Sequence, residues 1–305
     1  YLLHLGKGFL ELFIRIVDQR LAAKKAKIMV TADALKIVIN AIFGKMGGKH
    51  EWLLDVQALY SVTIPGQLYL LMLIERLTLA GIDVFYGNTD GITAIVKDDK
   101  EAEYMRICNE WEAELGFDLE FVDIDRMLLR DVNNYTCRLS NGYIKEKGAF
   151  VTEPLVHKQI DSLIIPKAIR AWFYDNVPVG DFIKSGKSIG DYVMTVKIGS
   201  QYKPIYRTIQ YENGTPIMHD ETAQRVNRYY AGKGAKAGAL LKKKTVKGKA
   251  SYQTLLSESA VVLINDWDKH DNIPMNYTYY IHRAMKIVDS FLMTKDQTSL
   301  SNELF

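Results

Sequence analysis

The chain has 305 residues, of which 48% are hydrophobic, and this length predicts roughly two globular domains. Its 39 basic and 36 acidic residues nearly balance, so the net charge does not identify a nucleic-acid-binding protein, and the local clustering of cations matters more. The two cysteines, Cys108 and Cys137, exclude a disulfide framework and a four-cysteine zinc site and predict reduced thiols.

The sequence also gives expectations about location and extent. We find no run that approaches the about 20 apolar residues needed to cross a bilayer and no signal-peptide pattern. We therefore expect a cytoplasmic protein without a membrane partner, located in the host cell cytoplasm if its source is viral. The chain opens with Tyr1 rather than Met, which we interpret as a fragment of a longer protein.

The first 80 residues predict helices. Apolar residues recur at three- and four-residue steps over residues 8–30, and Thr31 is a candidate N-cap for a second helix over Ala34–Phe43, which ends at glycines. Residues 51–80 also favour helix, and Gln67–Leu79 is apolar nearly all round, which predicts burial.

The next 70 residues favour strands around one helix. Strand-like runs at 83–86 and 92–96 flank Gly87–Gly91, which predicts a tight hairpin, and a helix is expected at about 100–115. Further strands are expected near 118–125, 127–138 and 142–150, with a hairpin turn at Asn141-Gly142.

Residues after 150 have a different character. We expect helix at 155–175, a mixed region rich in Gly and Lys at 180–250, and helix again at 251–295 with a break at Ile273-Pro274. Tyr277, Tyr279 and Tyr280 favour core packing over base stacking, and the histidines show no spacing typical of metal ligands. The pattern as a whole predicts an α+β fold.

Three elements have side chains suited to phosphate chemistry. Asp90 lies at the tip of the first predicted hairpin, where a carboxylate is exposed and suits Mg²⁺; turn formation alone is the alternative interpretation. Lys36, Asn40 and Gly44 share one helix face, and Arg20 and Lys24 share another, so that two antiparallel helices could direct these cations into one cleft. A solvated basic face is the alternative.

The third element is the strand at 142–148. Alternation places Lys145 and Lys147 on one face of this strand, where a pair of cations could follow a phosphate backbone. An edge strand protected by lysines is the alternative interpretation.

The order and spacing of these elements resemble family B DNA polymerases over about residues 10–150. The run Lys36–Gly44 is similar to their fingers motif, and Arg20 with Lys24 to the upstream fingers pair that binds the triphosphate. Tyr86–Gly91 is similar to the palm motif Tyr-Gly-Asp-Thr-Asp-Ser, and Lys145–Gly148 to the lysine-rich motif that follows. The short fingers and the Asn-Thr-Asp-Gly form are most similar to phage members.

The resemblance implies a fold and an activity. Residues 1–50 would be helical-hairpin fingers, residues 51–150 a partial antiparallel-sheet palm, and residues 151–305 a mainly helical thumb with a basic mixed segment. The protein would be a DNA-directed DNA polymerase of DNA replication, with primer–template DNA, dNTPs and replication accessory proteins as partners. Two Mg²⁺ ions would assist nucleotidyl transfer.

The resemblance also implies site residues. Asp90 would be a catalytic metal ligand, and Lys36 would act on the triphosphate as a catalytic residue. The implied nucleotide-binding residues are Arg20, Lys24, Lys36, Asn40 and Gly44. The implied DNA-binding residues are Tyr86, Thr89, Lys145, Lys147, Gly148, Lys242, Lys243 and Lys244.

The chain departs from the family pattern in several places. Asn88 replaces the first palm aspartate, Gly91 replaces a serine, and Ala41 and Phe43 replace a serine and a tyrosine. The upstream palm carboxylate and the exonuclease domain would precede Tyr1, and two-metal transfer needs both carboxylates to hold ions about 4 Å apart. We therefore expect no primer extension by this chain alone.

A dense cationic segment follows within the implied thumb. Its glycines predict flexibility, and such a segment suits sequence-independent phosphate contact, with a solvated mobile loop as the alternative. Its cations are Arg225, Arg228, Lys233, Lys236, Lys242, Lys243, Lys244, Lys247 and Lys249.

Two other functions stay open. A non-catalytic nucleic-acid-binding module that kept a polymerase scaffold is favoured by Asn88. A reverse transcriptase ranks lower, because those enzymes resemble this chain less: they have two adjacent carboxylates in the hairpin, where this chain has Asn-Thr-Asp.

Overall fold

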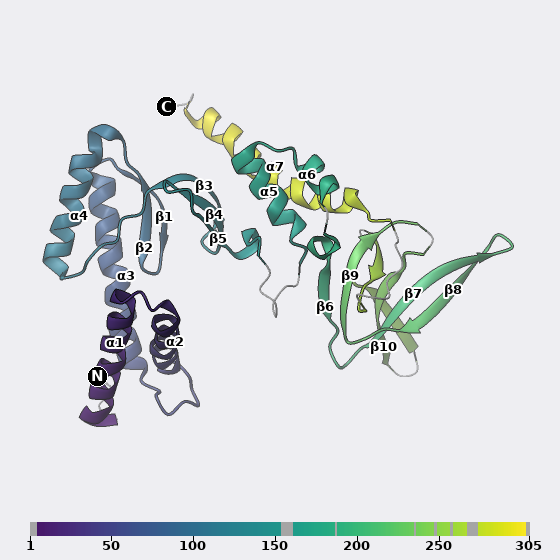
Figure 1. Ribbon diagram of the computed structural model, residues 1–305, viewed down its shortest axis with the longest axis horizontal. Coiled ribbons are helices and arrows are strands. Elements are labelled where there is room, and N and C mark those ends of the chain that lie inside the picture. The colour runs from purple at the N-terminus through teal and green to yellow at the C-terminus, as the bar shows by residue number, and fades with distance from the viewer. Residues whose placement is uncertain are drawn as a thin grey trace. The chain divides into compact units, whose positions relative to one another are not determined.

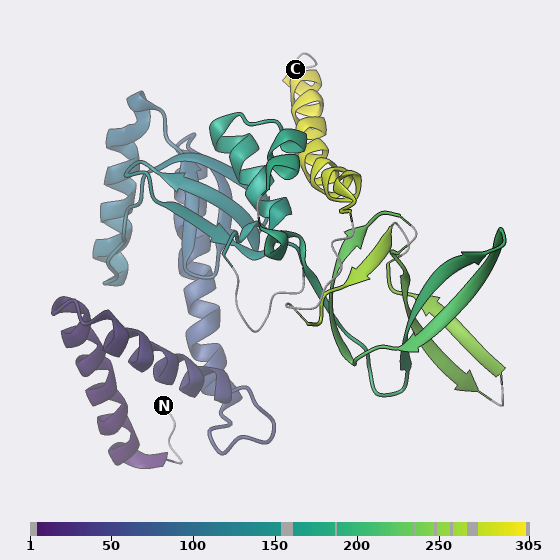
Figure 2. The same cartoon turned by 45° about the vertical axis from the view of Figure 1, so that its right-hand side comes forward.

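The computed structural model describes residues 5–153, 161–186, 188–234, 236–246, 249–256, 259–266 and 274–302 (Figure 1, Figure 2). The chain divides into two compact units, residues 1–121 and residues 122–305, which we call unit 1 and unit 2. Helices and antiparallel strands occur in both units, so the predicted α+β class is confirmed.

Unit 1 begins with two helices joined by a tight turn, α1 (Gly6–Lys25) and α2 (Met29–Lys45). The turn closes through a hydrogen bond from the Ile28 backbone N–H to the Ala23 carbonyl, with Lys27 at a positive φ of 58°. The small residues Ala23 and Ala32 are buried. The helical hairpin is therefore confirmed, but the predicted cap is wrong, since Thr31 lies inside α2.

Helix α3 (Val56–Leu79) follows, and the Asp55 carboxylate caps it by accepting from the Ala58 N–H at 2.9 Å. Within Gln67–Leu79, however, Leu73 and Leu77 are buried while Leu71 is 57% exposed. The expected all-round burial is wrong, because the rest of unit 1 covers one side of the helix only.

The length and composition of α3 test the expectation that no segment of the chain is apolar and long enough to cross a membrane. Among the described residues, α3 is the one helix long and apolar enough to cross a bilayer by those two criteria. The expectation that no run approaches that limit is therefore wrong, although a single helix of this kind is weak evidence for a membrane span.

A hairpin and a helix complete unit 1. Strands β1 (Asp83–Asn88) and β2 (Gly91–Ile95) pair antiparallel, and the short 3-10 turn η2 (Asp98–Lys100) leads into α4 (Glu101–Leu115). The second half of α3 packs against both, through a buried cluster that includes Leu77, Ile82 and Trp111. The hairpin and this helix are confirmed as predicted.

Unit 2 opens with a three-stranded sheet in the order β3-β4-β5. Its strands are β3 (Ile124–Asp131), β4 (Asn134–Leu139) and β5 (Ile144–Lys147), followed by the 3-10 turn η3 (Gly148–Phe150). The turn at Asn141-Gly142 joins β4 to β5 as predicted. The strand expected at 142–150 is confirmed as β5. The bounds expected for the other two strands are wrong, because residues 118–123 are not strand and a turn at residues 132–133 divides the run 127–138 between β3 and β4.

The rest of unit 2 combines helices with two further sheets, in the orders β11-β10-β7-β8 and β12-β9-β6. The helical elements are α5 (Ile164–Asp175), α6 (Val179–Ser185), η4 (Ile189–Tyr192) and α7 (Tyr277–Asn302). The strands, which we call the β-region, are β6 (Met194–Lys197), β7 (Lys203–Glu212), β8 (Thr215–Thr222), β9 (Val226–Gly232), β10 (Ala239–Val246), β11 (Lys249–Thr254) and β12 (Ala260–Leu263).

The β-region corrects the expectation of a mainly helical thumb. The basic segment lies largely on β9, β10 and β11, and residues 251–254 and 260–263 are strand rather than helix. Two of its glycines lie at close contacts: a Cβ on Gly232 would lie 2.4 Å from Val262 Cγ2, and one on Gly238 would lie 2.4 Å from the Arg207 carbonyl oxygen. These glycines allow strands to pack closely. Lys247, Ile273 and the predicted helix start at 155–160 lie outside the described residues.

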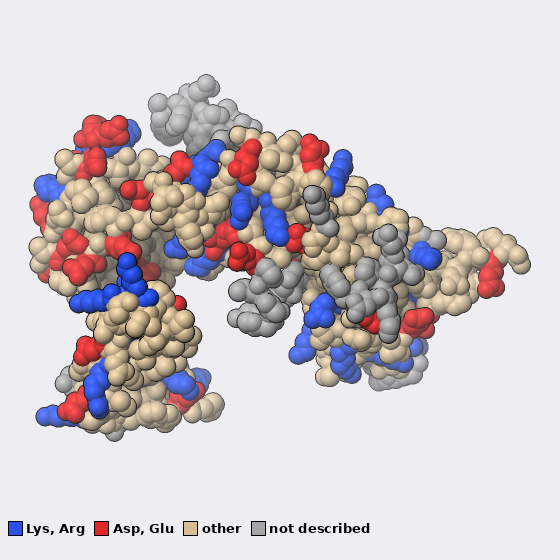
Figure 3. Space-filling model, in the orientation of Figure 1, with Lys and Arg blue, Asp and Glu red and all other residues tan. Residues whose placement is uncertain are grey.

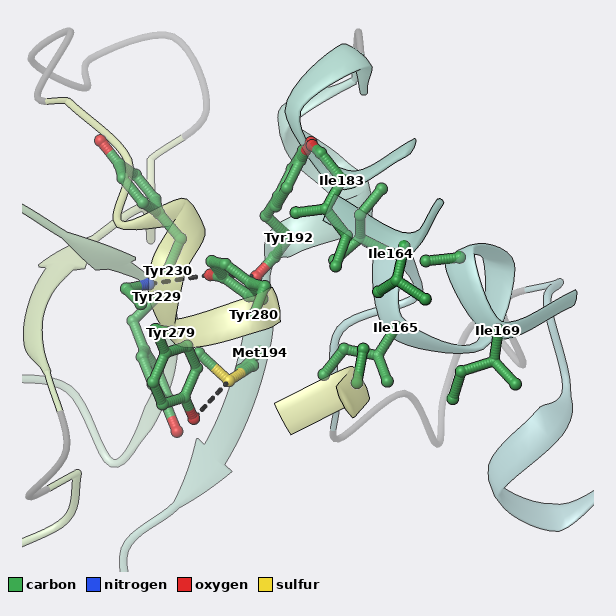
Figure 4. Close-up of a cluster of buried hydrophobic side chains, with 14 of the residues drawn as sticks. Ile164, Ile165, Ile169, Ile183, Tyr192, Met194, Tyr229, Tyr230, Tyr279 and Tyr280 are labelled. Atoms are coloured by element: carbon green, nitrogen blue, oxygen red, sulfur yellow. Dashed lines mark hydrogen bonds between the residues drawn. The ribbon is translucent and has the colours of Figure 1, made fainter. Parts of the chain in front are cut away.

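One continuous core joins the helices of unit 2 to the β-region (Figure 4). The hydroxyl of the fully buried Tyr280 donates to the Tyr192 carbonyl at 2.8 Å and accepts from the Ala231 N–H at 2.9 Å. Burial raises the pKa of Tyr192 to about 12, so its hydroxyl, which donates to the Ile183 carbonyl, keeps its proton. The core role predicted for Tyr279 and Tyr280 is confirmed.

Candidate functional site

The β1–β2 turn is a two-residue turn under strain. Asn88 pairs with Gly91, so Thr89 and Asp90 form the turn. Thr89 has a positive φ of 24°, which is rare for a β-branched residue. A residue held in such a region costs about 1–3 kcal/mol, and residues of this kind cluster at functional sites.

Side-chain hydrogen bonds stabilise this turn and leave the Asp90 carboxylate exposed. The Thr89 hydroxyl donates to Asn88 Oδ1 at 2.9 Å, and Asn88 Nδ2 donates to the Tyr86 hydroxyl at 3.2 Å. Asn88 therefore has a structural role in the turn. The exposed Asp90 forms no ion pair or side-chain hydrogen bond with the residues that the structure describes, so its carboxylate is available to a ligand.

Helix α2 presents the predicted polar face. Lys36, Asn40 and Gly44 are all exposed at successive turns of the helix. A Cβ built on Gly44 meets no atom within 4 Å, so the surface beside this glycine is open. Lys36 forms no ion pair with a described residue.

Helix α1 contributes two further cations. Lys24 is exposed, whereas Arg20 is half-buried. The Arg20 Nε is buried without a hydrogen-bond partner among the described residues. Buried donors in native proteins are nearly always paired, so this guanidinium has unused hydrogen-bonding capacity.

The hairpin runs back along α3 within unit 1. A Cβ on Gly87 would lie 3.5 Å from Ile74 Cδ1 of α3, which places the end of β1 beside the second half of that helix. The first half of α3 packs against the start of α1 and the end of α2 through Leu53, Ala58 and Phe9. In both cartoon views the β1–β2 turn is directed toward the end of unit 1 that holds α1 and α2 (Figure 1, Figure 2).

The metal-ligating capacity of the chain is limited. Among the described residues, no group of three or more His, Cys, Asp or Glu side chains could hold a metal ion. Asp90 would therefore contribute one carboxylate to a Mg²⁺ site, and these residues do not form a two-metal site by themselves.

Strand β5 carries the lysine-rich element in unit 2. Lys145 and Lys147 share one face of this edge strand, and Lys147 Nζ lies 5.9 Å from the centroid of the Tyr135 ring. On the opposite face, both oxygens of Glu146 are engaged, by Arg170 at 3.2 Å and by the Thr152 N–H at 2.8 Å. Lys145 is exposed and Lys147 is half-buried, so solvent reaches both side chains, as both interpretations of the sequence require.

Gly148 fixes the end of β5. Its φ is +63°, and a Cβ there would come within 2.2 Å of the Asn133 carbonyl oxygen. This glycine therefore has a conformational role whether or not it also contacts nucleic acid.

The lysines of β10 do not form one surface. Alternation places Lys243 on the face opposite to Lys242 and Lys244. Lys242 Nζ lies 5.6 Å from the Tyr202 ring centroid and Lys243 Nζ lies 5.4 Å from the Tyr252 ring centroid. Sequence reasoning missed Tyr202 and Lys203, whose place beside β10 depends on pairing with a distant strand.

Comparison with known proteins gives one partial similarity. No protein-family model matches the chain. The chain is 33% identical over 87 residues to DNA polymerase 2 of the archaeon Aeropyrum pernix, a match that covers 28% of this chain and 10% of that protein. The chain thus matches about a tenth of the length of this curated relative, and the similarity suggests a relationship to DNA polymerases.

Proposed function

We propose that the chain is part of a DNA-directed DNA polymerase of the family B type, similar to phage members, and that unit 1 holds its nucleotide site. The observation that carries this proposal is the exposed Asp90 on a strained turn, which forms no ion pair with a described residue and lies in the same compact unit as the polar face of α2. The partial similarity to an archaeal DNA polymerase supports it.

The roles of the residues follow from their chemistry. Lys36 and Lys24 would act as point charges on the triphosphate, and the partly unsatisfied Arg20 guanidinium would add hydrogen bonds to it. Asn40 and Gly44 would line the nascent base pair. Two bound Mg²⁺ ions would stabilise the charge that develops during nucleotidyl transfer, and Asp90 would be one of their carboxylate ligands.

Contacts with primer–template DNA belong to the same proposal. Tyr86 and Thr89 would border the primer end, and Lys145, Lys147 and Gly148 would lie along the duplex. These lysines would contact phosphates rather than bases, because a lysine is a point charge without a fixed geometry.

Metal-dependent binding of a dNTP to this chain tests the nucleotide site. We expect Mg²⁺ to strengthen binding, and Asp90→Asn to remove that gain with a loss of roughly tenfold, or about 1.4 kcal/mol. Asp98→Asn, an exposed carboxylate of η2 in the same unit, is the matched control and should bind as the unaltered chain does. Equal binding by Asp90→Asn and the control, at every Mg²⁺ concentration, would contradict the assignment.

A second candidate function is a non-catalytic nucleic-acid-binding module. Asn88 favours it, because this side chain holds the turn together at the position where the family has a carboxylate. Such a module would bind DNA without any metal-dependent binding of dNTPs. In primer extension we expect no product from this chain alone, and robust incorporation would refute that expectation.

A further inference from the structure

A pocket of about 550 Å³ opens on the β-region of unit 2. It lies where the turn between β6 and β7 meets the end of β8 and strand β10. Its lining includes three cations, three serine or threonine hydroxyls and no carboxylate. These are Lys203, Arg225, Lys243, Ser200, Thr222 and Thr245.

Two of the cations form a like-charged pair across the sheet. Lys203 on β7 and Lys243 on β10 are direct partners in the antiparallel register, an arrangement in which like charges destabilise a sheet. Neither lysine forms an ion pair with a described residue. Asp220 on β8 is near enough to Lys243 to interact with its charge, but Arg207 already binds both oxygens of this carboxylate, at 2.6 Å and 2.8 Å. An anion between the two lysines would remove the repulsion.

The third cation is held in place by the backbone. Arg225 Nη1 donates to the carbonyl oxygens of Gly199 at 3.2 Å and Tyr202 at 3.3 Å, which fixes the guanidinium against the β6–β7 turn. A guanidinium has five N–H donors, so most of them remain for an acceptor in the pocket. Such a planar fork matches the oxygens of a phosphate.

The surroundings favour a strand over a small free anion. The pocket is larger than one phosphate needs, and most of its lining residues are exposed, so a chain could pass through it. In Figure 3, Lys and Arg side chains gather over the end of the β-region that holds the β6–β7 turn.

We propose that this pocket holds a phosphate group of a nucleic-acid strand, between Lys203, Lys243 and Arg225. The choice of nucleic acid as the source of the phosphate rests on the proposed function, whereas the phosphate chemistry rests on the pocket. Tyr202 lies at the rim with Lys242 beside its ring, where an aromatic side chain can stack on a base.

Binding of labelled DNA to the full chain tests this proposal. The probes are a short single-stranded DNA and the corresponding duplex, each titrated over a series of salt concentrations. We expect the double variant Lys203→Ala/Lys243→Ala to bind about tenfold more weakly. For each phosphate that the variant no longer neutralises, its slope of log affinity against log salt should be smaller by about 0.9 with the duplex and by about 0.7 with the single strand. The control Lys244→Ala/Lys249→Ala removes two exposed lysines outside the pocket and should weaken binding less.

A thermal measurement separates loss of binding from loss of folding. The double variant removes a repulsive pair, so its midpoint temperature should equal or exceed that of the unaltered chain. Inorganic phosphate should raise the midpoint of the unaltered chain and leave that of the double variant unchanged.

Three results would overturn the proposal. The first is equal loss of DNA affinity in the double variant and its control. The second is no effect of phosphate on the midpoint of the unaltered chain. The third is stabilisation by phosphate or a free dNTP without any loss of DNA affinity in the double variant, which would make the pocket a small-anion site.

The outcome is independent of the nucleotide site. The double variant should keep the Mg²⁺-dependent binding of dNTPs that Asp90→Asn removes. Loss of DNA affinity in the pocket variant together with unchanged dNTP binding in Asp90→Asn would support the pocket and reject the polymerase proposal. Unchanged DNA affinity in the pocket variant together with weaker dNTP binding in Asp90→Asn would support the polymerase proposal and reject the pocket.

Discussion

Unit 1 and unit 2 bury their apolar side chains in different ways. Unit 2 has one continuous core that reaches from β3 through the helices to β12. Unit 1 has two separate clusters, one at each end of α3. Of the 33 large apolar side chains that are exposed among the described residues, 24 lie in unit 1. Apolar composition therefore predicted helices in unit 1 without predicting which of their faces that unit covers.

The difference has a physical consequence for each unit. Exposed apolar surface of this extent is typical of interaction surfaces rather than of an isolated domain. Unit 2 hides its apolar side chains and exposes charge, so its surface is suited to polar ligands. Stability should accordingly respond to substitutions in the core of unit 2 much more than to the same substitutions on the exposed face of α3.

A matched pair of truncations tests that comparison and should give the largest effect. Ile169 is 0% exposed in the core of unit 2, and Leu71 is 57% exposed on α3. We expect Ile169→Ala to lower the free energy of unfolding by about 2–5 kcal/mol, and Leu71→Ala to change it by about 0.5 kcal/mol or less. Urea unfolding of each variant measures both values. A comparable loss for the two would show that the exposed face of α3 is covered in solution.

Glycines at two turns of the β3-β4-β5 sheet should differ by a smaller amount. Gly148 and Gly142 both have positive φ, at +63° and +85°, but a Cβ would clash with backbone at Gly148 and meets nothing within 4 Å at Gly142. We expect Gly148→Ala to destabilise by about 2 kcal/mol or more and Gly142→Ala by about 1 kcal/mol. Thermal unfolding of the two variants would reject this account if Gly142→Ala were the more harmful.

These tests also show what the sequence could predict. The hairpins at Thr89-Asp90 and at Asn141-Gly142 were predictable because turn chemistry is local, and α4 was predictable from its periodicity. The strands of the β-region were not, because Lys-rich segments such as 242–244 lie between β11 and β7, and β7 is far away in the sequence. Local composition there indicated a flexible loop.

The residues of the candidate sites also differ in whether local sequence could predict them. Asp90 and Lys36 could be named from local patterns, since each lies in a short run that resembles a polymerase motif. The phosphate pocket could not, because Lys203, Arg225 and Lys243 come from three separate segments. The role of Asn88 in fastening the turn also depended on the side-chain positions of Tyr86 and Thr89.

The buried tyrosines of unit 2 provide a test of its polar connections. Tyr280 makes two hydrogen bonds through a hydroxyl in the core, whereas Tyr211 is 68% exposed. We expect Tyr280→Phe to cost about 1–3 kcal/mol, because the Tyr192 carbonyl and the Ala231 N–H would lose their partner in a buried place. Tyr211→Phe should be close to neutral. Denaturant unfolding measures both, and a neutral Tyr280→Phe would mean that water replaces the hydroxyl.

The smallest expected effect concerns the strained turn of unit 1. At an ordinary position glycine is less stable than alanine by about 0.5–1 kcal/mol, because it loses more conformational freedom on folding. At position 89 the sign should reverse, since a positive φ costs a residue with a Cβ about 1–2 kcal/mol and Thr89 has a φ of 24°. Both Thr89→Gly and Thr89→Ala remove the hydroxyl that donates to Asn88. A difference in stability between the two variants therefore reports the cost of the positive φ at position 89.

We expect Thr89→Gly to unfold at a higher temperature than Thr89→Ala, and both to bind a dNTP with Mg²⁺ less tightly than the unaltered chain. The reason is that the hydroxyl and the strained backbone together fix the position of Asp90, and a looser turn would present its carboxylate in more than one orientation. If Thr89→Ala were instead the more stable of the two, the turn would carry no strain, and the geometry of the turn would no longer mark Asp90 as a functional residue.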